Sequence, residues 1–265
     1  MKVKFLLLSL MPIFVFAKVH YAKVEPYETI VVKSSVSALV LDVNLEAEGS
    51  MVEDKKVVNL DDRLDKLNLE ASKKNKLLLD EMFKINKDIA EGLKSTLERQ
   101  EGYYKRINKL STASKTQKDN AYSVYISAKT QYLNTKEKIA NLEKQINDIA
   151  YKIAQLKDSI EKKSLILKHQ YLYKLMVRKG DHVVPGSTLA EVMDADRAKL
   201  VLFLDADEIK ELKEKIIYLD DKKTEYKVNK VWRVADKKFI SSYRAEIYIP
   251  APKDFFSKLV KVEIK

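Results

Sequence analysis

The sequence contains no cysteine, which excludes several classes of site. None of its 265 residues can form a disulfide, supply a thiolate ligand to a metal or act as a cysteine nucleophile. A lipid attached to a cysteine behind an N-terminal signal is excluded for the same reason. The redox compartment of the protein is left undetermined by this absence.

Glycine and proline are also scarce, with five residues of each. No proline occurs between Pro26 and Pro185, and only Gly49, Gly92 and Gly102 interrupt that span as glycines. Both residue types weaken or end helices, so their scarcity favours long uninterrupted helices. With 34% charged and 46% hydrophobic residues, the composition is typical of a chain that is a coiled coil in part.

The N-terminal hydrophobic run is shorter than the usual bilayer-spanning segment. Basic residues at Lys2 and Lys4 precede an apolar stretch of roughly 12 residues, and Val15 and Ala17 fit a cleavage site. We therefore expect a secretory signal over residues 1–17, removed so that the mature chain begins at Lys18. An uncleaved N-terminal anchor is the alternative, although a span needs about 20 apolar residues.

The net charge of +11 falls to +9 when Lys2 and Lys4 leave with the signal. The remaining lysines are spread among acidic residues along helical faces, which is typical of a solvated surface. Weak attraction to an anionic membrane or to acidic partner surfaces is the second interpretation. Export argues against nucleic acid as a partner.

A heptad pattern predicts two antiparallel helices joined by a turn. The return arm has apolar positions at alternating steps of three and four, which favours a coiled-coil seam. These positions are Tyr125, Ala128, Tyr132, Thr135, Ile139, Leu142, Ile146, Ile149, Ile153, Leu156, Ile160, Lys163 and Leu167. The less regular stripe of the first arm is Leu78, Met82, Ile85, Ile89, Gly92, Thr96, Tyr103, Ile107 and Leu110.

The turn is predicted near Thr112, because Ser114 and Gln117 have the spacing of a capping box at the start of the return helix. Folding the sequence about residue 112 pairs apolar residues of the two arms and places the tyrosines opposite small residues. The expected pairs are Leu78 with Ile146, Met82 with Leu142, Ile85 with Ile139, Gly92 with Tyr132, Thr96 with Ala128, and Tyr103 with Ala121.

Two similar short motifs flank this helical region. Gly49 and Val52, followed by the apolar pair Val57 and Val58, are matched downstream by the segment 180–194. Each motif has the pattern of a strand, a tight turn and a strand. We therefore predict that two halves of one β-unit are separated by the helical hairpin, with Val52 and Val183 in a common core.

Strand-like segments surround the second motif. Residues 29–32 and 36–45 precede the hairpin, and 199–204 follows the second motif before a short helix over 208–213. The later strand candidates are 215–219, 224–234, 243–249 and 259–264. Several strands with one short helix are typical of a small β-barrel.

The segment 177–189, with Gly180, Val183 and Gly186, resembles the second half-lipoyl motif of periplasmic adaptor proteins, also called membrane fusion proteins. The resemblance covers nearly the whole mature chain. It implies an α+β fold, in which a split lipoyl-like β-domain is interrupted by a long antiparallel α-helical coiled-coil hairpin and followed by a small β-barrel. The domains expected are a signal peptide at 1–17, N-terminal strands and the first lipoyl half at 18–60, the hairpin at 61–169 with its tip at 110–117, the second lipoyl half at 170–197 and the barrel at 198–265.

The tip also resembles that family. Arg106, Leu110 and Ser114 are similar to the arginine, leucine and serine with which adaptor hairpins dock on a TolC-like outer-membrane channel. At the tip, the interval from the leucine to the serine is shorter than in the family. In the first half-motif, Lys55 and Lys56 stand where the family has its second glycine. Gly49, Val52, Gly180, Val183 and Gly186 are expected to have structural roles in the lipoyl-like turns.

The resemblance implies an adaptor of a tripartite efflux pump in the periplasm, associated with the inner membrane and assembled as a homo-oligomeric ring. A transporter of the resistance-nodulation-division type is favoured. An ATP-driven exporter or a type I secretion system is the alternative, and a coiled-coil envelope spacer without a transporter is a second. No enzyme activity, cofactor or metal is expected, because His20, His169 and His182 lie far apart and no nucleophile-base spacing surrounds them.

Overall fold

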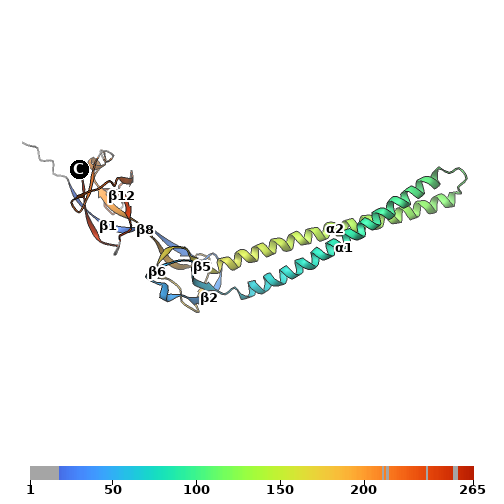
Figure 1. Ribbon diagram of the computed structural model, residues 1–265, viewed down its shortest axis with the longest axis horizontal. Helices are drawn as coiled ribbons and strands as arrows, with labels where there is room; N and C mark the ends of the chain where they lie inside the picture. Colours follow the sequence, from blue (N-terminus) through green and yellow to red (C-terminus); the bar gives the residue numbers. More distant parts are fainter. Residues whose placement is uncertain (1–17, 211, 213–214, 237, 253–255) are drawn as a thin grey trace, which may run out of the picture.

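The protein is elongated, with two β-domains at one end and a helical hairpin that extends away from them (Figure 1). The computed structural model describes residues 18–265 except 211, 213–214, 237 and 253–255. The expected signal peptide lies outside the described residues. The expected architecture is confirmed: a hairpin interrupts a lipoyl-like domain, and a half-barrel of antiparallel strands follows.

The hairpin consists of α1 (Arg63–Lys109) and α2 (Lys115–Lys162). At about 1.5 Å per residue, helices of 47 and 48 residues extend roughly 70 Å. Neither is apolar enough along its length to lie across a bilayer, and no other helix in the described part of the chain qualifies.

The seam predicted for α2 is confirmed. Its buried and half-buried side chains recur at the expected positions, with Ala121, Ala128 and Leu142 the most enclosed. The predicted continuation to Leu167 is wrong, because α2 ends at Lys162 and Leu167 is a core residue of a strand. The hairpin therefore ends before residue 169, and the second lipoyl half begins earlier than residue 170.

The seam predicted for α1 is displaced by one residue. Leu78, Met82 and Ile85 are 60%, 45% and 49% exposed, whereas the buried side chains of this helix are Ser72 and Asn86. The seam consists of residues 65, 69, 72, 76, 79, 83, 86, 90, 93, 97, 100, 104 and 107, each of which is half-buried or buried. Only Ile107 belongs to both stripes.

The error has a physical cause. Several residues of the predicted stripe are followed by another large apolar or aromatic residue, as in Leu78-Leu79, Met82-Phe83 and Tyr103-Tyr104, so hydrophobicity alone does not separate the two stripes. The true seam also contains polar residues that a hydrophobic count rejects. Asn86 is tolerated there because its side-chain amide donates to the backbone oxygen of Met82 at 2.7 Å.

The register between the arms is corrected as well. In an antiparallel hairpin, the residue numbers of two facing positions have a constant sum, which is twice the number of the residue at the centre of the turn. This sum is 228 for the contact of Asp65 with Lys163 and 229 for that of Tyr104 with Tyr125. Folding about Thr112 requires 224. Steps of whole heptads from these contacts place Asn86 opposite Leu142 and Ala90 opposite Ile139. The expected pairing of Ile85 with Ile139 is therefore wrong, and the two arms fold back about a point near Ser114 in the sequence.

The lipoyl-like domain is completed by strands from both sides of the hairpin. Before the hairpin lie β2 (Ala38–Val43), a 3-10 turn η1 (Leu45–Ala47), β3 (Ser50–Val52) and β4 (Lys55–Leu60). After it lie β5 (Ser164–Leu167), β6 (Gln170–Leu175), β7 (His182–Val183) and the first part of β8 (Thr188–Leu204). The pairs β3 with β6, β4 with β5 and β2 with β7 all join the two halves. Val52 and Val183 lie in the same hydrophobic core.

A two-stranded ribbon continues from this domain into the half-barrel. The strand β1 (Val19–Lys33) pairs with β8 from Lys23 opposite Val201 to Lys33 opposite Thr188. The pairing shifts between Pro26 and Glu28, at the boundary between the two domains. The expected boundaries are corrected here, because the first residues of β1 belong to the half-barrel and not to the lipoyl-like domain.

The rest of the half-barrel surrounds a second core. It contains a short helix α3 (Ala206–Ile209) and strands β9 (Ile217–Leu219), β10 (Lys222–Lys223), β11 (Val228–Val231), β12 (Tyr243–Pro250) and β13 (Leu259–Ile264). The strand order is β10-β9-β13-β1-β8-β12-β11. Its core includes Ala22, Leu200, Leu204, Ile247 and Val262.

Candidate docking site

The hairpin tip is a short, well-capped turn. Leu110 is the C-cap of α1, with φ −76° and ψ 121°, and its backbone N–H donates to the Ile107 oxygen at 3.2 Å. Ser114 is the N-cap of α2. The predicted capping box is present: the Gln117 N–H donates to Ser114 Oγ at 3.3 Å, and the Ser114 N–H donates to Gln117 Oε1 at 2.9 Å.

The three residues predicted to dock lie together at this end. Arg106 and Leu110 are one helical turn apart and both are exposed, Leu110 by 50%. The guanidinium Nη1 of Arg106 is 3.6 Å from the place that a Cβ on Gly102 would take. The arginine therefore lies back along α1 over the glycine, in the direction in which helical side chains point. Ser114 is also exposed, but it is engaged in the cap.

The two tyrosines next to these residues lie on different faces of α1. Tyr103 was placed in the seam by the register, yet it is 46% exposed and lies on the outer surface near Arg106. Tyr104 occupies the seam, where its ring stacks on Tyr125 with centroids 5.7 Å apart and lies 5.3 Å from Tyr122. Aromatic contacts of this kind add to the burial energy, so this cluster holds the two arms together just below the tip. The Tyr-Tyr pair in the sequence was the available signal, and the one-residue displacement of the predicted α1 stripe selected Tyr103 in place of Tyr104.

The charge around the tip is positive. Arg106 and Lys109 lie in the last turn of α1, where cations interact favourably with the helix dipole. Lys115 begins α2. One turn below, a hydrogen bond from Lys105 to Glu101 raises the pKa of the lysine and neutralises that pair. The tip thus offers an exposed leucine among cations, a surface suited to carbonyl or carboxylate groups and an apolar groove.

All three glycines of the lipoyl-like turns have a positive φ. Gly180 and Gly186 both have φ near +94°, a conformation that residues with a side chain rarely adopt. Gly49 has φ +76° at the start of the first motif. Lys55 and Lys56, which stand where the family has its second glycine, begin β4, and the positive φ of the turn between β3 and β4 falls on Asp54, at +46°. Aspartate tolerates this region better than most residues, which explains how the turn forms without a glycine.

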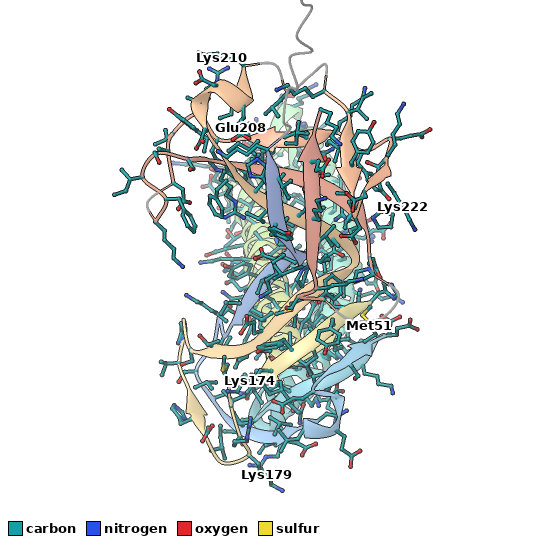
Figure 2. All side chains as sticks on the ribbon, turned by 90° about the vertical axis from the view of Figure 1, so that its left-hand side faces the viewer. Met51, Lys174, Lys179, Glu208, Lys210 and Lys222 are labelled. Atoms are coloured by element: carbon teal, nitrogen blue, oxygen red, sulfur yellow. The ribbon has the colours of Figure 1, made fainter. Side chains whose placement is uncertain are left out.

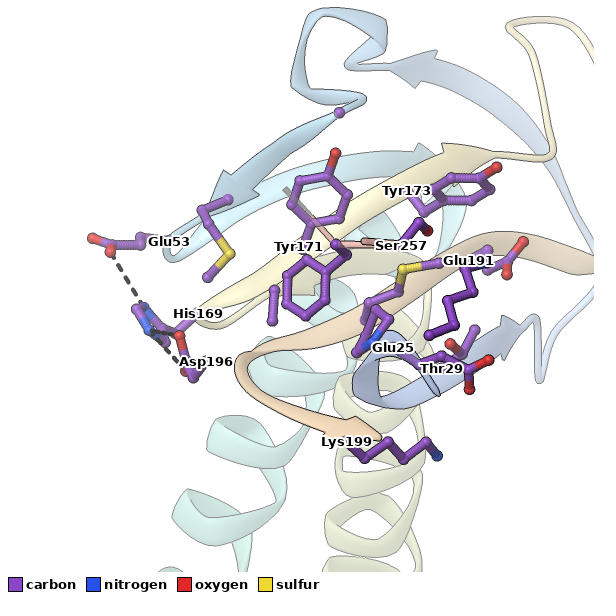
Figure 3. A pocket seen from close by; sticks show the side chains of 17 residues that line it. Glu25, Thr29, Glu53, His169, Tyr171, Tyr173, Glu191, Asp196, Lys199 and Ser257 are labelled. Carbon is purple, nitrogen blue, oxygen red and sulfur yellow. Dashed lines mark hydrogen bonds and ion pairs between the residues drawn. The ribbon is translucent and has the colours of Figure 1, made fainter. Parts of the chain in front are cut away.

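An open cavity of about 930 Å³ lies where the lipoyl-like domain meets the half-barrel (Figure 3). Its lining includes the apolar residues Met51, Tyr171 and Met193. At one edge His169 lies between two carboxylates, with Nδ1 3.2 Å from Glu53 and Nε2 3.0 Å from Asp196. The charge of Asp196 raises the pKa of His169. Sequence reasoning missed this junction, because its residues come from separate strands.

The other two histidines lie elsewhere. His20 Nε2 is 2.7 Å from Glu208 in the half-barrel, and His182 Nε2 is 3.2 Å from Ser37 Oγ in the lipoyl-like domain. Within the described ranges, no three histidine, aspartate or glutamate side chains are grouped so that they could hold a metal ion.

Comparison with known proteins gives structural matches only. No protein-family model matches the sequence, and no curated protein sequence matches it. The fold is similar to MacA from Actinobacillus actinomycetemcomitans, with a TM-score of 0.73 and 14% identity over 94% of this chain and 79% of that one. It is also similar to the membrane fusion protein Spr0693 from Streptococcus pneumoniae R6, with a TM-score of 0.59 and 11% identity over 94% and 99% of the chains.

A third match is a MacA-MexA chimeric protein that contains the Pseudomonas aeruginosa MexA alpha-hairpin domain. Its TM-score is 0.55 with 15% identity, over 94% of this chain and 79% of that one. These proteins align along the hairpin, the lipoyl-like domain and the half-barrel together, since each alignment covers nearly all of the described residues. The chain therefore has the fold of the periplasmic adaptor, or membrane fusion, proteins.

Proposed function

We propose that this protein is the periplasmic adaptor of a tripartite efflux pump, bridging an inner-membrane transporter to a TolC-like outer-membrane channel. The observation that carries the proposal is the position of the hairpin, which interrupts the lipoyl-like domain and ends in a capped tip with Arg106 and Leu110 exposed. A two-helix rod of roughly 70 Å has no room for a buried site between its helices, so we infer that it connects parts of an assembly. The role is non-enzymatic, without cofactor or metal.

The transporter contacts the lipoyl-like domain and half-barrel in this proposal, and the channel contacts the tip. A resistance-nodulation-division transporter is favoured by the sequence resemblance, with an ATP-driven exporter or type I secretion system as the alternative. The location is the periplasm, at the surface of the inner membrane, after export by the N-terminal signal.

A homo-oligomeric ring is part of the proposal, and the surface of α1 supports it. Beside its seam this helix has a second apolar stripe that α2 does not cover, with Leu78, Met82, Ile85 and Ile89 between 45% and 60% exposed. A helix with two adjoining stripes can pack against two neighbours at once. The second neighbour would be a helix of another copy of the chain.

Site-specific photo-crosslinking in the intact cell envelope tests the proposal. A photoreactive residue at Leu110 should capture an outer-membrane channel, and one at Lys222 on the half-barrel should capture an inner-membrane transporter, both identified by mass spectrometry. Capture of other copies of the chain alone, from both positions, would favour a coiled-coil envelope spacer and contradict the adaptor role.

A further inference from the structure

Two short segments that join β11 to β12 present large apolar side chains to solvent. Ile240 is 85% exposed, Val234 is 79% exposed and Phe239 is 44% exposed. We call residues 232–236 and 238–242 the distal loop. Single exposed apolar residues are ordinary, but three of this size in one loop indicate an interaction surface.

Hydrogen bonds fix the shape of the distal loop. The Asp236 carboxylate accepts from the N–H groups of Lys238 and Phe239 at 2.8 and 3.2 Å. The Asp236 N–H donates to the Ser242 oxygen, and the Ser242 N–H donates to the Phe239 oxygen, both at 2.9 Å. The ring of Phe239 also contacts that of Phe203, with centroids 4.3 Å apart. The hydrogen bond from the Ser242 N–H to the Phe239 oxygen encloses Ile240 in a short turn, from which its side chain extends into solvent.

The distal loop lies at the end of the half-barrel farthest from the hairpin. Tyr243, the first residue of β12, pairs with Leu204, the last residue of β8. The described chain begins at the same end: Lys18 forms an ion pair with Asp205, and Ser242 Oγ donates to that same Asp205 at 3.4 Å. Figure 2 faces the molecule from this side, with Glu208 and Lys210 at the upper edge of the half-barrel. The apolar N-terminal stretch of the sequence is thus joined to the fold beside the distal loop.

Basic groups accompany the apolar ones. Arg233 is exposed and has no ion pair among the described residues, and Lys238 is exposed with its Nζ 5.8 Å from the Phe239 ring centroid. Trp232, at the start of the loop, lies between Lys230 and Arg244, whose cationic groups are 4.4 and 5.0 Å from its ring. Aromatic and aliphatic residues together with cations are typical of segments that lie in the headgroup region of a bilayer.

We propose that the distal loop is a membrane-surface anchor, which places Ile240, Phe239 and Val234 in the headgroup region of an anionic bilayer with Arg233 and Lys238 on the lipid phosphates. Insertion would remove from water the three apolar side chains that the fold leaves exposed. Each basic group near an anionic surface adds electrostatic attraction. The contact goes beyond the proposed adaptor role, because it assigns lipid binding to the half-barrel itself. It also orients the molecule so that the hairpin points away from the membrane surface.

The absence of cysteine allows a direct test on the full chain. A fluorophore sensitive to polarity is attached to Ile240→Cys and, as the control, to Lys222→Cys on an exposed strand of the half-barrel. Vesicles of phosphatidylethanolamine with phosphatidylglycerol are compared with vesicles of phosphatidylcholine. With anionic vesicles, we expect the probe at position 240 to shift to the blue and to be quenched by nitroxide-labelled lipid. The probe at position 222 should show neither effect. Phosphatidylcholine vesicles should give no response, and salt should weaken the response to anionic vesicles.

A second measurement reports on the unlabelled protein. Trp232 is the single tryptophan, and its fluorescence should shift to the blue when the protein binds vesicles. With the double substitution Phe239→Ser and Ile240→Ser, the lipid concentration that gives half of this shift should rise by about tenfold. Unchanged circular dichroism shows that the variant is folded.

Three results would overturn the inference. The probe at position 240 could stay in water while the chain is bound to anionic vesicles. It could be shielded without vesicles and become exposed once residues 1–17 are removed, so that the N-terminal segment covers the loop. It could also respond only to membranes containing the transporter, so that the partner is a protein. None of these results would bear on docking at the hairpin tip, which the crosslinking from Leu110 tests separately.

Discussion

Lys163 Nζ lies 2.7 Å from Asp65 Oδ2, and this ion pair joins the end of α2 to the first turn of α1. Ser159 Oγ donates to the same carboxylate at 3.0 Å. Both charged side chains are largely shielded, with 14% of Lys163 and 21% of Asp65 exposed. The pair lies where the hairpin leaves the lipoyl-like domain, so it holds the base of the rod closed.

Asp65→Asn should destabilise the protein by about 1–3 kcal/mol at neutral pH, because a charged hydrogen bond is lost and Lys163 keeps its charge. The hydrogen bond from Lys163 lowers the pKa of Asp65 below 3.8. A lowered pKa gives stability that is present above the unfolded value and is lost as pH falls through the folded value.

The difference between wild type and Asp65→Asn should therefore be constant from pH 5 to 8 and shrink as the pH falls below about 4. Urea denaturation at a series of pH values measures it, with Asp148→Asn on the exposed surface of α2 as the control. A difference that grew on acidification would show that the carboxylate is not ionised in the fold.

The corrected register predicts which cysteine pairs can link. Asn86→Cys with Leu142→Cys should form an intramolecular disulfide under mild oxidation, because both side chains are buried in the seam three heptads from the Asp65 and Lys163 contact. Ile85→Cys with Ile139→Cys should not, since Ile85 points outward. Gel mobility without reductant distinguishes them, and efficient linking of the second pair would restore folding about Thr112.

The shared core of the two half-motifs predicts a sharp contrast between adjacent valines. Val183 is 2% exposed in the lipoyl-like core, whereas Val184 is 50% exposed. Val183→Asp should cost about 3 kcal/mol or more, because it buries a charge without a partner. Val184→Asp should change the stability by about 0.5 kcal/mol at most. Thermal unfolding followed by circular dichroism decides it; equal melting temperatures for both variants would separate the two halves into independent domains.

The sequence predicted the architecture well where one physical signal acted alone. The α2 seam could be read because its heptads contain one clear apolar stripe, and the capping box at Ser114 is a local pattern. The α1 seam could not, because Leu78-Leu79 and Met82-Phe83 offer two stripes and the partner helix selects the one that contains Asn86. The path of β1 through both domains and the cavity beside His169 depend on strand pairing over long separations, for which a single sequence holds no periodic signal.

The exposed tip predicts a separation of function from stability. Arg106→Asp and Leu110→Asp remove a cation and an apolar knob that make no contact with the distant cores, so unfolding temperature and helicity should stay near those of the wild type. Lys157→Asp and Leu67→Asp, exposed positions toward the base of the hairpin, are matched controls for charge and apolar character.

The central claim is that the hairpin tip connects this protein to an outer-membrane channel, and export measured in cells at matched expression tests it most directly. The account predicts that Arg106→Asp and Leu110→Asp each reduce export by at least about tenfold, a loss of more than about 1.4 kcal/mol in the docking equilibrium, while the two base variants export normally. Full export by both tip variants would contradict it.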